Sequence, residues 1–538
     1  MRKIKLRPYQ LNAIKLIRGA YKETNKILVQ SPTGSGKTEI IFSIINGYLK
    51  NEKKVLFVVR RRQIVFQTVR RIVESGISNV GIIMSGKTPS PIFPVQVCSI
   101  DTIHSKIKRR DIDFIKKFDA IFMDEAHDTT SDSYRSFIWW LEGKEHSDYN
   151  KPEFLDLKVK KDYFGFTATP YRIGKKTHEW WGKCIVVTTP DKLRDLGYLC
   201  EAKLYVPLSI STKGVKIENT GDYNQEQLYE AVSKKAVMGK IVDEYIHKGE
   251  RRPAVCFAVN KKHSIEIAKF FNDLGIEAYH VEDTTSQEDR DFVIRKVKNA
   301  FYERKPFVIC NVNIFSTGVD IPELCVGIMA RPTESRVLWT QQLGRLLRPL
   351  KGKDKAVIID HSGNSLRFGS PFHYHPPEMG KESFDKPSPI SICPKCYYYH
   401  DKIVSVCEAC GTHIKSYLKT LRPGEERHIE KDESFMMGDY EKLLELEIKD
   451  YVHKNVRYEL EVKKKSEKEA WSRAYKKFGV NFLKVAEKVG CPDYVVKGLK
   501  KEGLLKSAMS SKIIFGEGFD PVQNFDNELE KFAETIGV

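Results

Sequence analysis

The stretch Ser31-Pro-Thr-Gly-Ser-Gly-Lys-Thr38 decides the fold of the first part of this 538-residue chain. An apolar run, residues 27–29, precedes it, and a helix-like run, residues 39–45, follows it. Strand, glycine loop and helix together are the context of a phosphate-binding loop. Gly34 and Gly36 permit a tight turn that points backbone N–H groups at an anion, beside the positive end of the helix.

Within this loop, Lys37 would reach the β- and γ-phosphates of a nucleotide, and the Thr38 hydroxyl would hold Mg²⁺. The other loop residues expected to contact the nucleotide are Thr33, Gly34, Ser35 and Gly36. The glycine and lysine spacing alone also arises by chance in long chains. The flanking strand and helix favour the phosphate-binding interpretation.

The composition predicts a large globular protein with an excess of positive charge. Lys and Arg total 90 against 71 Asp and Glu, a formal net charge of +19, which suits either a nucleic-acid partner or a generally basic surface. The length suggests roughly three to four domains. No apolar run approaches the ~18 residues of a membrane helix. Residues 1–8 lack a signal-peptide core, so we expect a cytoplasm-like compartment and no membrane partner.

A second chemical motif, Asp124-Glu-Ala-His127, follows the strand-like run 120–123. Two carboxylates at the end of a buried strand are costly unless a cation is present. Beside a phosphate loop, Asp124 would hold Mg²⁺, and Glu125 would orient and deprotonate the attacking water. In isolation, such a pair is usually a strand-end turn.

Three further groups in the first half carry weaker signals. Arg60 and Arg61, at the end of the apolar run 54–59, suit either a clamp on a nucleic-acid backbone or a solvated strand end. Thr102 follows the run 95–99 and could donate to a phosphate. Thr167 and Thr169 could pass a change at the γ-phosphate to a neighbouring domain by switching hydrogen bonds.

The order of these motifs resembles that of superfamily 2 helicases. Arg7-Pro-Tyr-Gln10, the phosphate loop, the acidic box and Thr167-Ala-Thr169 match the first half of the motif set. Residues 254–259, 310–322 and 341–348 look like motifs IV, V and VI, so the resemblance covers residues 1 to about 370. It implies that Gln10 reads adenine and that His127, Thr167 and Thr169 couple the nucleotide to the nucleic acid.

Motif VI, Gln341-Gln-Leu-Gly-Arg-Leu-Leu-Arg348, places Arg345 and Arg348 at i, i+3, on one face of an expected helix. Facing ATP on a neighbouring domain they would act as arginine fingers, whereas without a nucleotide they would be surface arginines. Gln341 would position water or contact the γ-phosphate.

Motif V departs from the family at one position. Val312 stands where many relatives have a threonine that contacts the nucleic-acid strand, so Ser316 and Thr317 would substitute for it. Gly318 would permit a sharp turn, and Asp320 would contact the ribose or the arginines.

The predicted fold class is therefore α/β, with two tandem RecA-like parallel-sheet domains and ATP bound between them. Five apolar runs support the second sheet: 254–259, 278–281, 307–312, 326–330 and 356–359. The expected domains are an ATP-binding domain at 1–190, a helicase C-terminal domain at 191–375, a zinc ribbon at 385–420 and a helical basic module at 425–538.

The ribbon is predicted from Cys393-Pro-Lys-Cys396 and Cys407-Glu-Ala-Cys410. Two such pairs within a short loop suit one structural Zn²⁺ site with four thiolates, and redox dithiols are the alternative. Tyrosines 397–399 inside this loop are expected to pack rather than to stack on bases. In the last module, aromatic residues interleaved with Lys and Arg over 471–512 suit either a helical core or a DNA contact.

The segment Asp360-His-Ser-Gly-Asn364 followed by a four-cysteine ribbon resembles the bacterial and phage RadD-type repair helicases. The resemblance implies a DNA helicase or translocase in recombination, repair or replication. Its cofactors would be ATP, Mg²⁺ and Zn²⁺. It would be a monomer in the nucleoid or in a host cytoplasm, with single-strand-binding or recombination proteins as partners. The alternatives are an RNA helicase, a non-unwinding motor subunit of a restriction-like complex, or a zinc-dependent scaffold.

Overall fold

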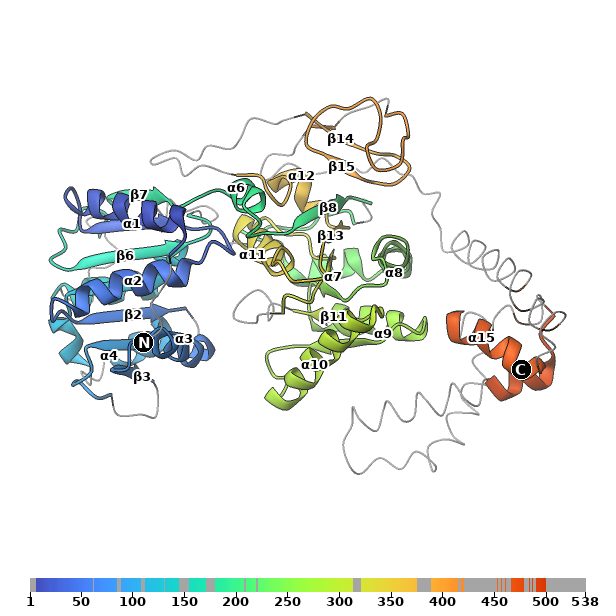
Figure 1. Cartoon of the computed structure of the whole chain (residues 1–538), viewed down its shortest axis with the longest axis horizontal. Coiled ribbons are helices and arrows are strands. Elements are labelled where there is room, and N and C mark those ends of the chain that lie inside the picture. Colours follow the sequence, from blue (N-terminus) through green and yellow to red (C-terminus); the bar gives the residue numbers. More distant parts are fainter. Residues whose placement is uncertain are drawn as a thin grey trace. The chain divides into compact units, whose positions relative to one another are not determined.

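A computed structural model shows two parallel sheets, a small antiparallel ribbon and a helical C-terminal unit (Figure 1). The structure describes residues 6–374, 389–414, 418–419 and part of 452–499, with gaps at 61, 85–88, 108–111, 130, 145–153, 171–179, 208–209, 219–220 and 313–320.

The first sheet has seven parallel strands in the order β3-β4-β2-β5-β6-β1-β7. In chain order they are β1 (Lys26–Gln30), β2 (Val55–Val59), β3 (Val80–Ile83), β4 (Val95–Ser99), β5 (Ala120–Asp124), β6 (Asp162–Thr167) and β7 (Lys183–Val186). The helical segments are α1 (Pro8–Tyr21), α2 (Lys37–Leu49), α3 (Arg62–Glu74), α4 (Ile100–Ile107), η1 (Asp113–Lys117), η2 (Ala126–Asp128), α5 (Asp132–Leu141) and α6 (Pro190–Asp195).

The strands of this sheet are nearly continuous apolar runs because hydrophobic cores cover both faces. All five residues of β2 are buried, and so are all six of β6. Gly165 in β6 leaves room for an indole: a β-carbon there would collide with Trp181 and lie 2.7 Å from Ala126 Cβ. A strand glycine is thus explained by close packing rather than by a turn.

The second sheet has six strands in the order β10-β11-β9-β12-β13-β8. They are β8 (Glu201–Tyr205), β9 (Ala254–Phe257), β10 (Ala278–Val281), β11 (Val308–Asn311), β12 (Val326–Met329) and β13 (Lys355–Asp360). The accompanying helices are α7 (Gln225–Val232), α8 (Lys235–Lys248), α9 (Lys261–Asp273), α10 (Gln287–Glu303), α11 (Arg336–Leu346) and α12 (Asn364–Phe368). The expected pair of parallel-sheet α/β domains is confirmed, and the five predicted runs are β9 to β13, with β8 as an unpredicted edge strand.

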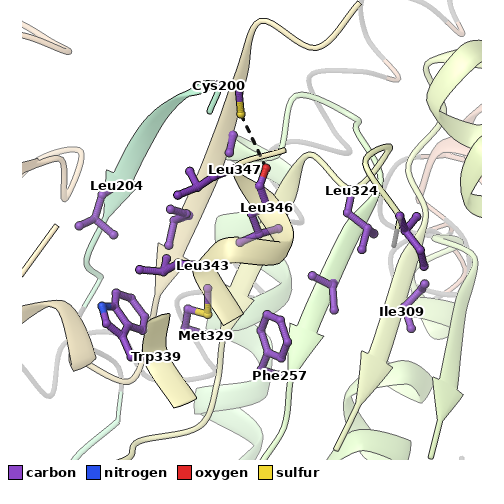
Figure 2. Close-up of a cluster of buried hydrophobic side chains, with 14 of the residues drawn as sticks. Cys200, Leu204, Phe257, Ile309, Leu324, Met329, Trp339, Leu343, Leu346 and Leu347 are labelled. Carbon is purple, nitrogen blue, oxygen red and sulfur yellow. Dashed lines mark hydrogen bonds between the residues drawn. The ribbon is translucent and has the colours of Figure 1, made fainter. Parts of the chain in front are cut away.

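The core of the second sheet includes one face of α11. Figure 2 shows Trp339, Leu343 and Leu346 of this helix packed near Met329 of β12 and Phe257 of β9. Because α11 is anchored by these buried side chains, its polar residues keep a fixed orientation relative to the sheet.

The ribbon is antiparallel and contains β14 (Pro389–Ile392), β15 (Tyr399–His400) and β16 (Leu418–Lys419). It is attached to the edge of the second sheet: Tyr398 forms an antiparallel bridge with Tyr205 of β8, and Val206 N–H donates to Tyr397 O at 2.7 Å. Ile390 and Tyr399 are buried in the core of that sheet. The ribbon therefore covers an otherwise open sheet edge, and the expected packing role of the tyrosines is observed.

The C-terminal unit contains α15 (Glu467–Phe478) and its own apolar cluster, which includes Val456, Trp471 and Val495. The aromatic Trp471 is buried there, whereas Tyr494 is exposed. Among the described residues, no helix is long and apolar enough to cross a membrane. The domain boundaries given above stay predictions.

We expect Gly165→Ala to lower the free energy of unfolding by about 1–3 kcal/mol, because the added methyl group overpacks the contact with Trp181. Gly47→Ala is the matched control. Gly47 lies in the exposed interior of α2 with open space around its α-carbon, so alanine there should be neutral or stabilising. Urea unfolding of both variants makes the comparison, and equal stability of the two would contradict the packing argument.

Candidate active site and metal centre

The phosphate loop has the conformation that its glycines predict. Gly34 and Gly36 have φ of +84° and +73°, and α2 begins directly after them, at Lys37. A β-carbon on Gly36 would strike the Gln10 carboxamide, and one on Gly34 would lie 2.7 Å from Leu199 Cδ2. Both glycines are required for backbone conformation and for space.

The loop is braced by α1. Gln10 is buried and donates from Nε2 to the carbonyls of Ser35 and Gly36, at 2.8 and 3.2 Å, while its Oε1 accepts from Arg7 N–H. The Tyr9 hydroxyl donates to Ser35 O at 2.8 Å. The Ser35 hydroxyl is used inside the loop, where it donates to Pro32 O. Gln10 thus supports the loop, and its contact with adenine stays a prediction.

The structure brings the loop lysine and the acidic box together. Lys37 Nζ lies 2.5 Å from Asp124 Oδ1 and 3.9 Å from Glu125 Oε1. Burial disfavours the lysine charge, but the two carboxylates outweigh it and raise the pKa of Lys37. Burial also acts to raise the pKa of Glu125, yet the neighbouring Lys37 and His127 leave that pKa lowered. Lys37 and Glu125 are therefore both charged at neutral pH.

A chain of side-chain contacts leads from the acidic box to β6. Glu125 has a left-handed backbone, φ +53°, and its Oε2 lies 3.3 Å from His127 Nδ1. The same His127 nitrogen lies 3.1 Å from Thr167 Oγ1, which donates to Thr169 O at 2.9 Å. Burial lowers the pKa of His127, so the ring is neutral at pH 7. The predicted coupling residues therefore form one chain of contacts that starts in the box at His127, passes to Thr167 and ends at Thr169.

Motif VI reaches the same site. A β-carbon on Gly344 of α11 would lie 2.5–2.7 Å from the Thr33 side chain, so this helix passes directly over the phosphate loop. Burial lowers the pKa of Arg345 to about 10, and the charge of Glu125 opposes that shift. Arg345 thus interacts electrostatically with the expected catalytic carboxylate. Gln341 Nε2 is buried with no hydrogen-bond partner among the described residues.

The expectation that Arg345 and Arg348 share one helical face is wrong. Helix α11 ends at Leu346, so Arg348 lies beyond it. Pro349 follows Arg348 and disfavours helical backbone at that position. The free carbonyl of Leu346 is taken instead by the Lys353 side chain at 2.6 Å. Arg348 therefore belongs to a loop rather than to the helix.

Two protein families match the two parallel-sheet domains of this chain. Residues 3–172 match the model of the type III restriction enzyme res subunit, and residues 236–349 match the helicase conserved C-terminal domain. The chain carries the two motor domains of a superfamily 2 helicase. Such domains imply ATP and Mg²⁺, and together with the helicase-named relatives they support an ATP-hydrolysing, nucleic-acid-dependent enzyme.

The chain matches three curated relatives, and the match covers a different share of each relative's length. A 51.5 kDa protein of a Lactococcus phage is 27% identical over 71% of this chain and 77% of its own. The putative ATP-dependent helicase IRC3 of Saccharomyces cerevisiae is 30% identical over 67% of this chain and 52% of its own. The EcoKI type I restriction endonuclease subunit of Escherichia coli is 24% identical over 67% and 34%. The helicase thus spans about half of the yeast relative and a third of the restriction subunit.

The four cysteines of the ribbon gather at one point. The Sγ atoms of Cys393, Cys396, Cys407 and Cys410 all lie within 4.8 Å of one another. Cys393 and Cys410 are 3.5 Å apart and Cys396 and Cys407 are 3.6 Å apart, close to the roughly 3.8 Å between thiolates in a tetrahedral zinc site. Hydrogen bonding by Thr412 lowers the pKa of the Cys410 thiol to about 6, whereas burial raises the pKa values of Cys396 and Cys407, so the case for zinc rests on the positions of the four sulfur atoms. The four residues therefore fit Zn²⁺ and leave no open position.

The positions of the residues predicted to contact nucleic acid do not by themselves identify a binding surface. Arg60 pairs with Asp128 at 2.9 Å, next to the acidic box, and keeps 43% of its side chain exposed. Thr102 is buried, with its hydroxyl 2.9 Å from Ser99 Oγ. Five predicted residues lie outside the described residues: Arg61, Ser316, Thr317, Gly318 and Asp320.

Several residues near the loop were not predicted. The Arg7 guanidinium stacks 3.6 Å over the Tyr198 ring, and Tyr9 meets the same ring edge-on. Leu199, which touches Gly34, belongs to the core of the second sheet. No local motif marks Tyr198 or Leu199, because their contact with the loop is set by the path of the chain between the sheets.

We expect the wild-type chain to carry one zinc ion and Cys407→Ser to lose it, with a lower thermal midpoint because the ribbon holds Tyr399 in the core of the second sheet. Zinc released by a mercurial reagent, measured with a chromogenic chelator, gives the content per chain. Cys184→Ser, a half-buried cysteine outside the cluster, is the control and should retain one zinc. Undiminished zinc in Cys407→Ser would rule out the site.

Proposed function

We propose that this helicase couples ATP hydrolysis to translocation on DNA, with unwinding or remodelling as the result. One observation carries the proposal: Lys37, Asp124 and Glu125 meet at one edge of the first sheet, and helix α11, which carries Arg345, lies against the phosphate loop where Gly344 faces Thr33. The charge of Arg345 also interacts with that of Glu125. Such a mixed cluster of charges is the environment that a triphosphate requires.

In the proposed reaction, Lys37 exchanges its contact with Asp124 for the β- and γ-phosphates when ATP enters. Thr38 and Asp124 would then hold Mg²⁺, which neutralises phosphate charge. Glu125 orients the attacking water and accepts its proton, for which the charged carboxylate is the competent form. Arg345 and Arg348 stabilise the charge that develops on the transferred phosphoryl group.

The path for coupling is the contact chain Glu125, His127, Thr167 and Thr169. A carboxylate that moves to meet water changes its 3.3 Å contact with His127, and the imidazole is hydrogen-bonded to the end of β6. We propose that this shift is transmitted to the residues that grip nucleic acid. Arg60 is attached to the same chain through Asp128.

The choice of DNA as the proposed substrate rests on the relatives, because the formal net charge of +19 supports DNA and RNA alike as a polyanion partner. One relative whose name states a substrate is the DNA 3'-5' translocase XPB2 of Sulfurisphaera tokodaii, which is 23% identical over 66% of this chain. The finer proposal is a RadD-type repair helicase, because the Asp360 segment and the four-cysteine ribbon both follow the motor.

Two alternatives have specific support. An RNA helicase is favoured by the likeness to the pre-mRNA-splicing helicase prp28 of Schizosaccharomyces pombe, 27% identical over 45% of this chain. A non-unwinding motor subunit is favoured by the type III restriction family match.

Lys37→Ala, Glu125→Gln and Arg348→Ala are each expected to reduce nucleic-acid-stimulated ATP hydrolysis roughly a hundredfold or more, because each removes a charge that acts on the reacting phosphate or water. A coupled-enzyme assay of ADP release measures the rates. Lys50→Ala, at the exposed end of α2, is the matched control and should hydrolyse at the wild-type rate. Wild-type activity in any of the three variants would remove the role assigned to that residue.

The substrate is tested by measuring hydrolysis with single-stranded, duplex and branched DNA and with RNA of the same sequence. We expect DNA to stimulate at least tenfold more than RNA, and stimulation by RNA alone would overturn the proposal. Strand displacement on the same branched substrates then separates a helicase from a motor that hydrolyses ATP without unwinding.

A further inference from the structure

We propose that Lys353 is a positioning residue for Arg348: its buried ammonium closes the loop that carries this arginine and ties the loop to the segment just after residue 320. The inference rests on the role proposed above for Arg348. It begins from the observation that Arg348 lies outside α11, where helical geometry cannot orient it.

The Lys353 side chain is enclosed by backbone carbonyls. The residue is 6% exposed, and its Nζ donates to Leu346 O and Leu324 O, each at 2.6 Å, and to Pro322 O at 3.0 Å. An ammonium has three donors and no acceptor, so these three carbonyls use its full capacity. A flexible lysine is thereby fixed in one conformation.

The same residue closes the Arg348 loop at its base. After α11 ends at Leu346, the chain passes Arg348 and Pro349 and turns over 350–353, where Lys353 N–H donates to Leu350 O at 2.9 Å. Gly352 supplies the left-handed conformation of this turn, with φ of +91°. The Lys353 ammonium then returns to Leu346 O. Both ends of the loop containing Arg348 therefore meet at one side chain.

The base of the loop has a second support. Cys200 N–H donates to Leu347 O at 2.9 Å, and Cys200 Sγ lies 3.7 Å from Leu346 O, the contact drawn in Figure 2. These bonds join the end of α11 to the chain that enters β8. Lys353 adds what they do not supply, a link to Pro322 and Leu324, which follow the motif V segment.

The three carbonyls around Lys353 Nζ explain how a buried cation is stabilised at this position. Carbonyls at a helix C-terminus carry partial negative charge, and Leu346 O is one of them. Burial lowers the pKa of Lys353, and the charges of Arg252 and Arg348 lower it further. The charged ammonium therefore pays a desolvation cost that an apolar side chain would avoid. An apolar residue would leave three carbonyls without this donor, and the loop would lose its closure.

The test compares Lys353→Met with Lys351→Met. Methionine keeps the length and volume of the side chain without the charge, and Lys351 lies exposed in the same turn as a matched control. Nucleic-acid-stimulated ATP hydrolysis is measured at a temperature where circular dichroism shows each variant fully folded. We expect kcat of Lys353→Met to fall at least tenfold while KM for ATP changes less than threefold, with Lys351→Met at wild-type values. An unchanged kcat would overturn the inference, because it would reduce Lys353 to a purely structural role.

A double-mutant cycle separates this inference from the proposed function. If Lys353 acts through Arg348, Lys353→Met should cause no further loss of kcat in an Arg348→Ala background. A further tenfold loss there would contradict the inference while leaving the arginine's role intact. Wild-type activity in Arg348→Ala alone would instead remove the proposed role of the arginine.

Should Lys353→Met fail to fold, Lys353→Arg keeps a cation at the site. The planar guanidinium cannot reproduce the geometry of three carbonyls around one nitrogen. We expect kcat to fall at least threefold with KM retained, and a wild-type kcat would again count against positioning by Lys353.

Discussion

The contact between Lys37 and Asp124 is the interaction on which the rest of the motor site depends. Lys37 follows β1 and Asp124 ends β5, and these strands are separated in the sheet by β6. All three strands are parallel, so their carboxyl ends meet at one edge of the sheet. Consequently Thr167, at the end of β6, lies beside the acidic box, with its hydroxyl 3.1 Å from His127 Nδ1. The topology alone thus places the nucleotide-binding residues and the proposed relay in one row.

The second domain adds a guanidinium group, Arg345, to the positive charge that Lys37 already brings to the carboxylates. The position of this arginine depends on α11, which is anchored by apolar packing along its length. The helix passes over the phosphate loop at Gly344, where any side chain would collide with Thr33. Beyond the helix, hydrogen bonds to the last carbonyls replace helical geometry. In this view Lys353 and Cys200 belong to the arginine machinery, although neither lies in a helicase motif. The ribbon packs on the same domain as α11, because it covers β8 and buries Tyr399 in the core of the second sheet.

Residue patterns in the sequence predict much of this structure. Apolar runs beside chemical motifs predict β1, β2, β4 and β5, and cysteine spacing predicts the thiol cluster. Four strands of the two large sheets were not predicted. Three of them, β3, β7 and β8, are short or mixed in burial, so their composition resembles that of loops, whereas β6 is fully buried and was considered only for its threonines. The end of α11 was also not predicted, because the helical spacing of Arg345 and Arg348 was given more weight than Pro349, which disfavours helical backbone at Arg348. Contacts such as Tyr198 with Arg7 are set by tertiary folding and leave no local signal.

The most direct test of the two-domain ATP site is a structure with ADP, aluminium fluoride, Mg²⁺ and the nucleic acid that best stimulates hydrolysis. The account predicts Lys37 on the phosphates, with Thr38 and Asp124 at the metal. It also predicts that a guanidinium group of Arg345 or Arg348 lies within about 3 Å of the fluoride. A complex in which both arginines face away from the nucleotide would contradict it.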